Sequence, residues 1–209
     1  MKGIRRSRLL IPGTVVLAHL LWFATFYLTF GSFWIKIALS ASMLAAISLW
    51  AQRTMADRFR MDMKALFTGA AAAIALYFIF WAGKEISFFL FPFADDQIKD
   101  IYHRDAGGIP LWSIFLILLF ITGPSEEIFW RGFLQENLTL RFGSLKGFLL
   151  MTICYASVHL WSFNFILIGA AAVAGAFWGM LYGHTKNLAP LIISHSLWSA
   201  FIFAVIPLG

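Results

Sequence analysis

Long apolar stretches run through this sequence and constrain its fold more than any other feature. Seven of them, each roughly 15 to 25 residues long, can be recognised at 9–31, 33–50, 65–83, 110–134, 147–161, 165–183 and 188–208. About 20 helical residues are needed to cross the hydrocarbon core of a bilayer. The sequence therefore predicts an all-α, polytopic membrane helical bundle with about seven transmembrane helices.

The composition agrees with a membrane bundle and excludes an ordinary soluble domain. Hydrophobic residues make up 61% of the chain and charged residues only 12%, whereas soluble domains carry about 25% charged residues. The net charge of +6 does not indicate nucleic-acid binding, because the basic residues fall at the ends of apolar runs rather than in a stripe. No linker or low-complexity segment divides the chain, so we expect one membrane domain over 1–209.

The distribution of charge predicts the orientation in the membrane. Basic residues cluster before the first run and between the second and third runs, at Lys2, Arg5, Arg6, Arg8, Arg53, Arg58, Arg60 and Lys64. Cytoplasmic loops carry an excess of Lys and Arg, so the N-terminus and the 51–64 segment are predicted to be cytoplasmic. The more acidic stretch 84–109 is interpreted as a loop on the outer side of the membrane. Residues 1–109 would thus comprise the N-terminal helices followed by this outer loop.

Two adjacent glutamates interrupt the fourth run, in "TGPSEEIFWRGFLQENL". A carboxylate in hydrocarbon is costly unless it is paired, protonated or used in function. Glu127 and Arg131 are four residues apart and can form an ion pair on one helix face. Glu126 lies about 100° around the helix and has no such partner, which leaves it free for chemistry.

Two histidines occur in other apolar runs, His159 in the fifth and His195 in the seventh. One histidine in an apolar helix is more often a core residue, but two histidines and an unpaired glutamate on three different spans indicate function. Counting residues along the spans places Glu126, His159 and His195 at depths that allow one shared cavity. Ser199 lies one turn beyond His195 and could bond to a substrate or to the site.

The sixth run contains Gly175, Gly179 and Gly183 at intervals of four residues. This spacing leaves one helix face nearly without side chains, which suits close helix packing or a dimer contact. We favour close packing inside the bundle.

The motifs "EEIFWR", "YASVH" and "HSLWS", in this order, resemble those of the CPBP (CAAX protease and bacteriocin-processing, or Abi) intramembrane endopeptidases. That family has EExxxR, then FxxxH, then His followed after three residues by Asn or Asp. Tyr155 stands here in place of the phenylalanine, and Ser199 in place of the Asn. The resemblance covers 110–205, which we therefore interpret as the catalytic core.

The resemblance implies an enzyme of the bacterial inner membrane that cleaves a membrane-anchored protein or peptide near its C-terminal region. Glu126, assisted by His159, would activate a water molecule, and His195 with Ser199 would stabilise the oxyanion. Glu127 and Arg131 would hold the helix in place. The bilayer and the substrate are the expected partners, and no nucleic acid is expected.

Three alternatives stay open from the sequence alone. Glu126, His159 and His195 also form a zinc ligand set, although the metal-free glutamic mechanism without a cofactor is favoured. Glutamate and histidine in a bundle also make proton relays, so a proton-coupled transporter is a second function. A non-catalytic, CPBP-like immunity or partner protein is a third. The sequence does not select a substrate or an oligomeric state.

Overall fold

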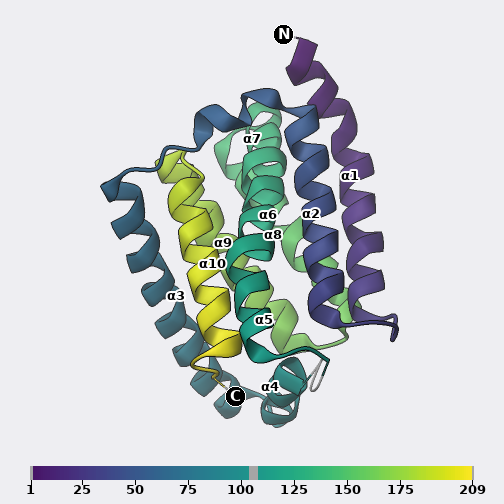
Figure 1. Cartoon of the computed structure of the whole chain (residues 1–209), viewed down its shortest axis with the longest axis vertical. Helices are drawn as coiled ribbons and strands as arrows, with labels where there is room; N and C mark the ends of the chain where they lie inside the picture. Colours follow the sequence, from purple (N-terminus) through teal and green to yellow (C-terminus); the bar gives the residue numbers. More distant parts are fainter. Residues whose placement is uncertain (1, 104–107, 209) are drawn as a thin grey trace.

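The structure is a computed structural model, and it describes residues 2–103 and 108–208 of the chain. These residues are predominantly helical and contain no β-strand. Most of the helices run along a common axis and form one bundle, while α4 crosses one end of it (Figure 1). The all-α membrane-type fold predicted from the sequence is confirmed.

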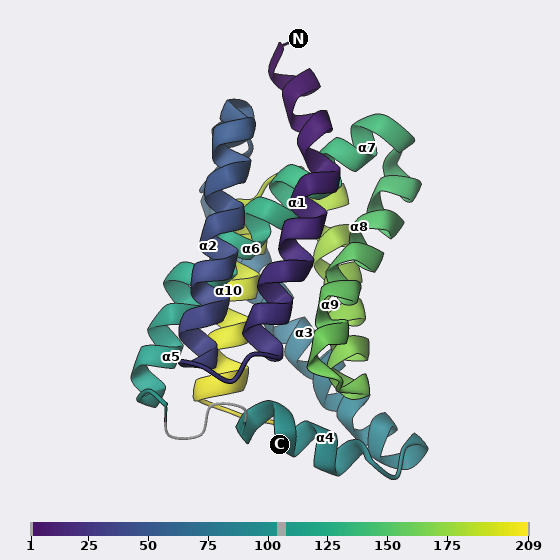
Figure 2. The same cartoon turned by 90° about the vertical axis from the view of Figure 1, so that its right-hand side faces the viewer.

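The first half of the chain supplies the outer helices of the bundle. In chain order they are α1 (Lys2–Phe26), α2 (Phe33–Ala51), the 3-10 helix η1 (Arg53–Arg58), α3 (Met63–Leu90) and α4 (Ala94–His103). Helices α1 and α2 form an antiparallel hairpin, and α3 packs along α10 on the other side (Figures 1 and 2). The Asp62 side chain caps α3 by accepting a hydrogen bond from the Ala65 N–H.

One continuous helical rod, Leu111–Phe142, forms the centre of the bundle. Its segments are α5 (Leu111–Ile117), the π-helical η2 (Leu118–Thr122), α6 (Gly123–Glu127), the π-helical η3 (Ile128–Gln135) and α7 (Glu136–Phe142). The Gly123 N–H bonds to the Leu118 carbonyl, five residues back. Pro124 has no N–H to give, so the regular ladder cannot continue through it. Wide π turns often mark functional sites, and here they flank the glutamate pair.

The last part of the chain returns through the bundle three times. Its elements are α8 (Ser144–Val158), the 3-10 turn η4 (His159–Ser162), α9 (Phe165–Thr185) and α10 (Ala189–Ala204). Gly143, at φ 86°, makes the turn between α7 and α8, a backbone conformation that suits glycine. The Asn164 side chain caps α9 by accepting from the Leu167 N–H.

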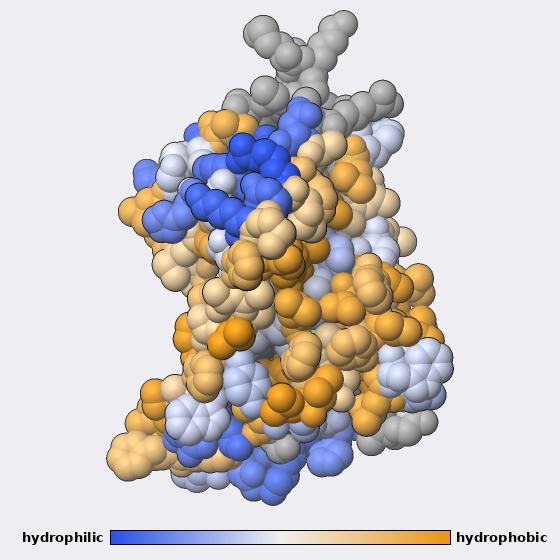
Figure 3. Space-filling model, turned by 60° about the vertical axis from the view of Figure 1, so that its left-hand side comes forward, coloured by the Kyte–Doolittle hydropathy of each residue, from blue (hydrophilic) through white to orange (hydrophobic). Residues whose placement is uncertain are grey.

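The two ends of the bundle differ in composition. The basic end comprises the start of α1, η1, the α7–α8 turn and the α9–α10 turn, whereas the α4 end contains α4, the α1–α2 turn and the end of α10 (Figure 1). Between them lies a broad apolar belt with hydrophilic surface above and below it (Figure 3). Such a belt matches the bilayer core.

Four helices are long and apolar enough to cross a membrane by length and composition: Phe33–Ala51, Met63–Leu90, Leu111–Phe142 and Phe165–Thr185. The apolar parts of α1 and α10 are shorter, at Leu10–Phe26 and Ala189–Ala204. Helix α8 has 15 residues. The chain is thus a multi-pass membrane protein, and each of the seven predicted runs overlaps a helix, while the number of membrane spans stays a prediction.

The stretch interpreted as an outer loop is largely helical. Helix α3 continues to Leu90, and Ala94–His103 forms α4; residues 104–107 lie outside the described part of the chain. Asp95 and Asp96 lie in the first turn of α4, where negative charge suits the helix dipole. Ile98 on the opposite face is buried against the bundle. Asp95, Asp96, Lys99 and Asp100 thus form the exposed face of an amphipathic helix, whereas Lys84 and Glu85 belong to α3.

Glycine residues let α8 and α9, next to the central rod, approach closely. A Cβ atom at Gly175 would lie 2.9 Å from the Tyr155 ring, and one at Gly179 would lie 2.8 Å from Met151. Close packing is therefore confirmed for these two glycines, whereas Gly183 has nothing within 4 Å of such an atom. The predicted glycine face is used along only part of its length.

We predict that Gly123→Ala destabilises the bundle, because a Cβ atom there would lie 2.5–2.9 Å from the backbone and Oγ of Ser196. Overpacking of this kind costs about 1–3 kcal/mol. The measurement is the unfolding midpoint in detergent. Gly13→Ala is the matched control, since Gly13 is also helical and has nothing within 4 Å of an added Cβ. Equal midpoints for the two variants would contradict the close α6–α10 crossing.

Candidate active site

The Glu127 carboxylate is the centre of a buried polar cluster. Arg131 Nη1 donates to Glu127 Oε1 at 2.8 Å, and His195 Nδ1 donates to the same oxygen at 2.7 Å. Glu127 and Arg131 are fully buried, and His195 is 4% exposed. The ion pair predicted from the four-residue spacing is confirmed. The guanidinium and imidazole offset the desolvation of the carboxylate, without which the charge would be costly.

Arg131 is held on several sides. Its Nη2 donates to the Gly175 carbonyl at 3.2 Å. The guanidinium carbon lies 4.8 Å from the centre of the Tyr155 ring and 5.4 Å from that of Trp178. A planar cation suits the faces of aromatic rings. The arginine therefore connects the central rod to both α8 and α9.

The His195 ring is fixed in its plane as well as at one nitrogen. It stacks on Trp178 with 3.9 Å between the ring centres and 15° between the planes. Trp178 Nε1 donates to Ser194 Oγ at 3.1 Å, which fixes the indole in turn. Because Glu127 occupies Nδ1, the nitrogen that His195 can offer to another molecule is Nε2.

Glu126 lies next to this cluster but is bonded differently. Its side chain is 6% exposed, and Oε2 has no hydrogen-bond partner among the described residues. His195, Glu127 and Arg131 are close enough to interact with it electrostatically. A buried, unpartnered carboxylate oxygen calls for an explanation, since almost all buried polar groups in proteins are satisfied.

His159 stands at the end of α8, where the chain turns into η4. Its Nδ1 donates to the Tyr155 carbonyl at 2.8 Å, so Nε2 is again the free ring nitrogen. Trp22, Phe26 and Tyr155 surround the ring, with ring centres 5.2 to 6.3 Å away. In the neutral ring with Nδ1 protonated, Nε2 is a hydrogen-bond acceptor.

The sequence-predicted residues meet at one cavity, which we name the chamber. It has a volume of ≈ 700 Å³, and Glu126, His159, His195 and Ser199 all line it. Most of the remaining lining is aromatic or aliphatic, contributed by α1 to α4, α9 and α10. Glu127 and Arg131 do not line the chamber but lie behind it. A largely apolar cavity with a few convergent polar groups is typical of a ligand or active site.

The chamber residues do not form an evident metal site. Among the residues that the structure describes, no three His, Cys, Asp or Glu side chains are grouped so that they could hold a metal ion.

Two features of the site were missed by sequence reasoning. The bond between His195 and Glu127 joins residues 68 apart in the chain, and only the packing of α10 against the rod creates it. Sequence reasoning did not single out Trp178, although it stacks on the His195 ring. The motif residue Tyr155 gave some signal, since it replaces an expected phenylalanine and lies under Arg131.

The comparison with known families agrees with this geometry. Residues 108–201 match the family model described as type II CAAX prenyl endopeptidase Rce1-like. This region, a little under half of the chain, is thus similar to the CPBP family, as the sequence motifs predicted. The match spans the central rod to α10 and thus includes every motif residue of the site, whereas α1 to α4 lie outside it.

No curated protein and no solved structure gives a significant match to the chain. The family match implies a membrane-embedded protease that acts on membrane-anchored protein substrates.

We predict that Arg131→Ala lowers the stability strongly, because it leaves the Glu127 carboxylate buried beside a histidine alone. Breaking a buried pair in this way costs about 3–5 kcal/mol. Unfolding midpoints in detergent measure the effect. Arg141→Ala serves as the control, since Arg141 is near the end of α7 and contacts the Phe142 ring. A midpoint for Arg131→Ala as high as that of the control would contradict the role of the pair.

Proposed function

We propose that the protein is an intramembrane endopeptidase in which Glu126 activates a water molecule to cleave a membrane-anchored protein or peptide near its C-terminal region. The observation that supports this most is the unpartnered Glu126 carboxylate oxygen in a chamber that two histidines and a serine also line. Everything else in that chamber is largely apolar, so these few groups would carry the chemistry.

In the first step, Glu126 takes a proton from a water molecule while the water oxygen attacks the carbonyl carbon of the scissile bond. His159 would accept the second hydrogen bond of this water at Nε2, because its Nδ1 is engaged with the Tyr155 carbonyl. General-base catalysis by a positioned group contributes roughly 10²–10⁴-fold. The two acceptors together orient a lone pair of the water towards the carbonyl.

The oxyanion that forms needs donors. His195 can supply one from Nε2 in its doubly protonated form, in which Nδ1 still donates to Glu127. Ser199, one turn further along α10, can supply a second donor from its hydroxyl. Fixed donors in a site that excludes water stabilise developing charge more than they would in water.

The tetrahedral intermediate then collapses. The C–N bond breaks, the carbonyl re-forms, and protonated Glu126 gives its proton to the leaving amine. Glu126 returns to its carboxylate form, so no external acid, oxidant or metal takes part in these steps.

We further propose that the N-terminus is cytoplasmic and that the protein resides in the inner membrane of a bacterial cell. The support is the basic end of the bundle, which collects Lys2, Arg5, Arg6, Arg8, Arg53, Arg58, Arg60, Lys64, Arg141, Lys146 and Lys186. Such an excess of Lys and Arg is typical of cytoplasmic segments.

We predict that Glu126→Gln reduces cleavage by roughly 10²–10⁴-fold while insertion is unchanged, because the amide cannot accept the proton of the water. Terminus mapping of membrane proteins, in cells with and without the protein, identifies substrates for the assay. Glu85→Gln is the matched control, since Glu85 is exposed on α3. A proton-coupled transporter would instead show altered uptake, and a non-catalytic partner protein would show no change in cleavage products.

We predict that Ser199→Ala lowers the cleavage rate by about 10²-fold, as removal of one oxyanion donor does. Ser199→Asn is expected to retain the rate or exceed it, because its amide donor reaches further than a hydroxyl. Initial rates on one substrate provide the measurement. A Ser199→Ala rate equal to that of the parent would remove Ser199 from the mechanism.

A further inference from the structure

We propose that the chamber is loaded through the side of the bundle in the leaflet at the α4 end, opposite the basic end. Its substrate is then a membrane-anchored polypeptide whose scissile bond is presented on the extracytoplasmic side. This inference rests on the proposed peptidase function and names the class of substrate that the site would take.

The chamber extends in one direction only. Along α9 its lining runs from Phe165, the first residue of that helix, to Trp178, a length of about 20 Å at the helical rise. On α2 the lining stops at Ile37, within the first turns after the α1–α2 loop. On α10 it runs from His195 towards the C-terminus. On every helix that lines the chamber, the lining residues therefore lie between the level of the catalytic residues and the α4 end.

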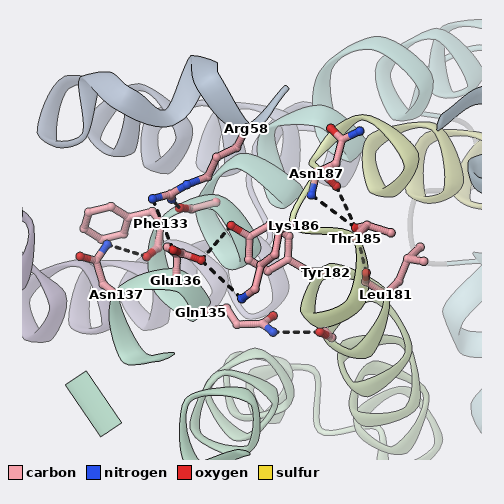
Figure 4. A network of polar contacts seen from close by, with 12 residues as sticks. Arg58, Phe133, Gln135, Glu136, Asn137, Leu181, Tyr182, Thr185, Lys186 and Asn187 are labelled. Carbon is pink, nitrogen blue, oxygen red and sulfur yellow. Dashed lines mark hydrogen bonds and ion pairs between the residues drawn. The ribbon is translucent and has the colours of Figure 1, made fainter. Parts of the chain in front are cut away.

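A polar network closes the opposite end (Figure 4). Glu136 accepts a hydrogen bond from the Tyr182 hydroxyl at 3.0 Å and forms ion pairs with Arg58 at 3.4 Å and Lys186 at 3.8 Å. Arg58 Nη1 also donates to the Gly132 carbonyl. These bonds fasten η1 and the end of α9 to the central rod, across the basic end of the bundle.

Hydrogen bonds also hold the turn between α9 and α10 against the end of η1 and the segment that follows it. Asn187 Oδ1 accepts from the Arg60 N–H at 2.9 Å, and Asn187 Nδ2 donates to the Arg60 carbonyl at 2.8 Å. The Leu188 N–H donates to the Arg58 carbonyl at 2.8 Å. Beneath this layer Met55 is 2% exposed and packs where a Cβ on Gly132 would lie. These contacts fill the space between η1, the central rod and the α9–α10 turn. A separate cavity of ≈ 340 Å³ lies at this end between α7, α8 and α9, and it shares no lining residue with the chamber.

At the other end α4 forms a roof over the chamber. Ile98, Ile101 and Tyr102 of α4 line the chamber at this end. Gln97 fastens this roof to the start of α9, because its carbonyl accepts from Asn164 Nδ2 at 2.7 Å and its side-chain oxygen accepts from the Ile166 N–H at 3.0 Å. The roof restricts the direct route from water into the chamber.

The side between α3 and α9 is more open. Ile79 and Ile86 of α3 line the chamber and are 41% and 58% exposed, and Val173 of α9 lines it and is 46% exposed. Apolar side chains at this edge would face lipid tails. Lys84 is the charged residue of α3 at this edge, and its ammonium group lies over the Phe88 ring, 5.3 Å from the ring centre. An apolar segment of a membrane-anchored substrate can therefore reach Glu126 from the bilayer past a mostly apolar edge.

The charge pattern determines which leaflet this is. The basic end is proposed to be cytoplasmic, so the α4 end, with Asp95, Asp96 and Asp100, faces the extracytoplasmic side. The chamber then serves polypeptides that have already been exported and remain anchored by an apolar segment. A segment held in the cytoplasmic leaflet would meet the closed end of the bundle.

The test labels single cysteines on intact cells with two thiol reagents, one membrane-impermeant and one lipid-soluble. The native Cys154 is first replaced by Ala. Asp100→Cys reports on the α4 end, where Asp100 is exposed, and Leu145→Cys reports on the basic end, where Leu145 is 70% exposed. We expect the impermeant reagent to label Asp100→Cys in intact cells and Leu145→Cys only after permeabilisation. Ser87→Cys reports on the chamber, which Ser87 lines from α3, and we expect it to react with the lipid-soluble reagent. The reverse pattern for Asp100→Cys and Leu145→Cys, or no reaction of Ser87→Cys with the lipid-soluble reagent, overturns the proposal.

A second experiment separates this inference from the peptidase function. One substrate identified by terminus mapping is fused so that the same anchor segment is presented on either side of the membrane. Cleavage of the extracytoplasmic form alone supports the proposal, and cleavage of the cytoplasmic form overturns it. If neither form is cut while Asp100→Cys reacts from outside and Ser87→Cys reacts with the lipid-soluble reagent, the orientation and lipid access of the chamber stand and the peptidase function fails.

Discussion

The carboxylate of Glu127 is the interaction on which the rest of the site depends. A charge placed inside an apolar bundle must be neutralised and hydrogen-bonded, and here Arg131 and His195 share one of its oxygens. The same arginine reaches the Gly175 carbonyl on α9. One acid therefore sets the position of three helices relative to one another. Its neighbour Glu126, at the wall of the chamber, keeps one carboxylate oxygen, Oε2, without a hydrogen-bond partner among the described residues.

Some of this arrangement could be predicted from the sequence because it depends on local spacing. The apolar runs gave the helices, and the interval of four residues gave the Glu127–Arg131 pair. Similar depths along their spans predicted that Glu126, His159 and His195 could share one cavity, and Ser199, one turn beyond His195, lines it too. The bond of His195 to Glu127 could not be predicted, because it depends on how α10 is rotated against the rod. The π turns beside Pro124 also escaped a prediction that assumed a regular helix.

The buried polar groups at the two ends of the bundle differ in how completely they are hydrogen-bonded. At the basic end they are satisfied by one another, as in the contacts of Glu136 with Arg58, Tyr182 and Lys186. Around the chamber they are few and partly unsatisfied, as with Glu126. Functional sites commonly give up local stability in this way, and the surrounding structure compensates for it. The hydrogen bonds and ion pairs at the basic end can thus fix the relative positions of the helices, while the chamber at the α4 end stays open for a ligand.

The fixed roof and the apolar side opening have a consequence for inhibitors. A compound that acts in the chamber would arrive by lateral diffusion from lipid, so its partitioning into the bilayer would govern its apparent potency. Adding extra vesicles would then weaken inhibition at constant aqueous volume, since the compound would be diluted over more lipid. Dose–response curves for such compounds are therefore meaningful only when the amount of membrane in the assay is stated.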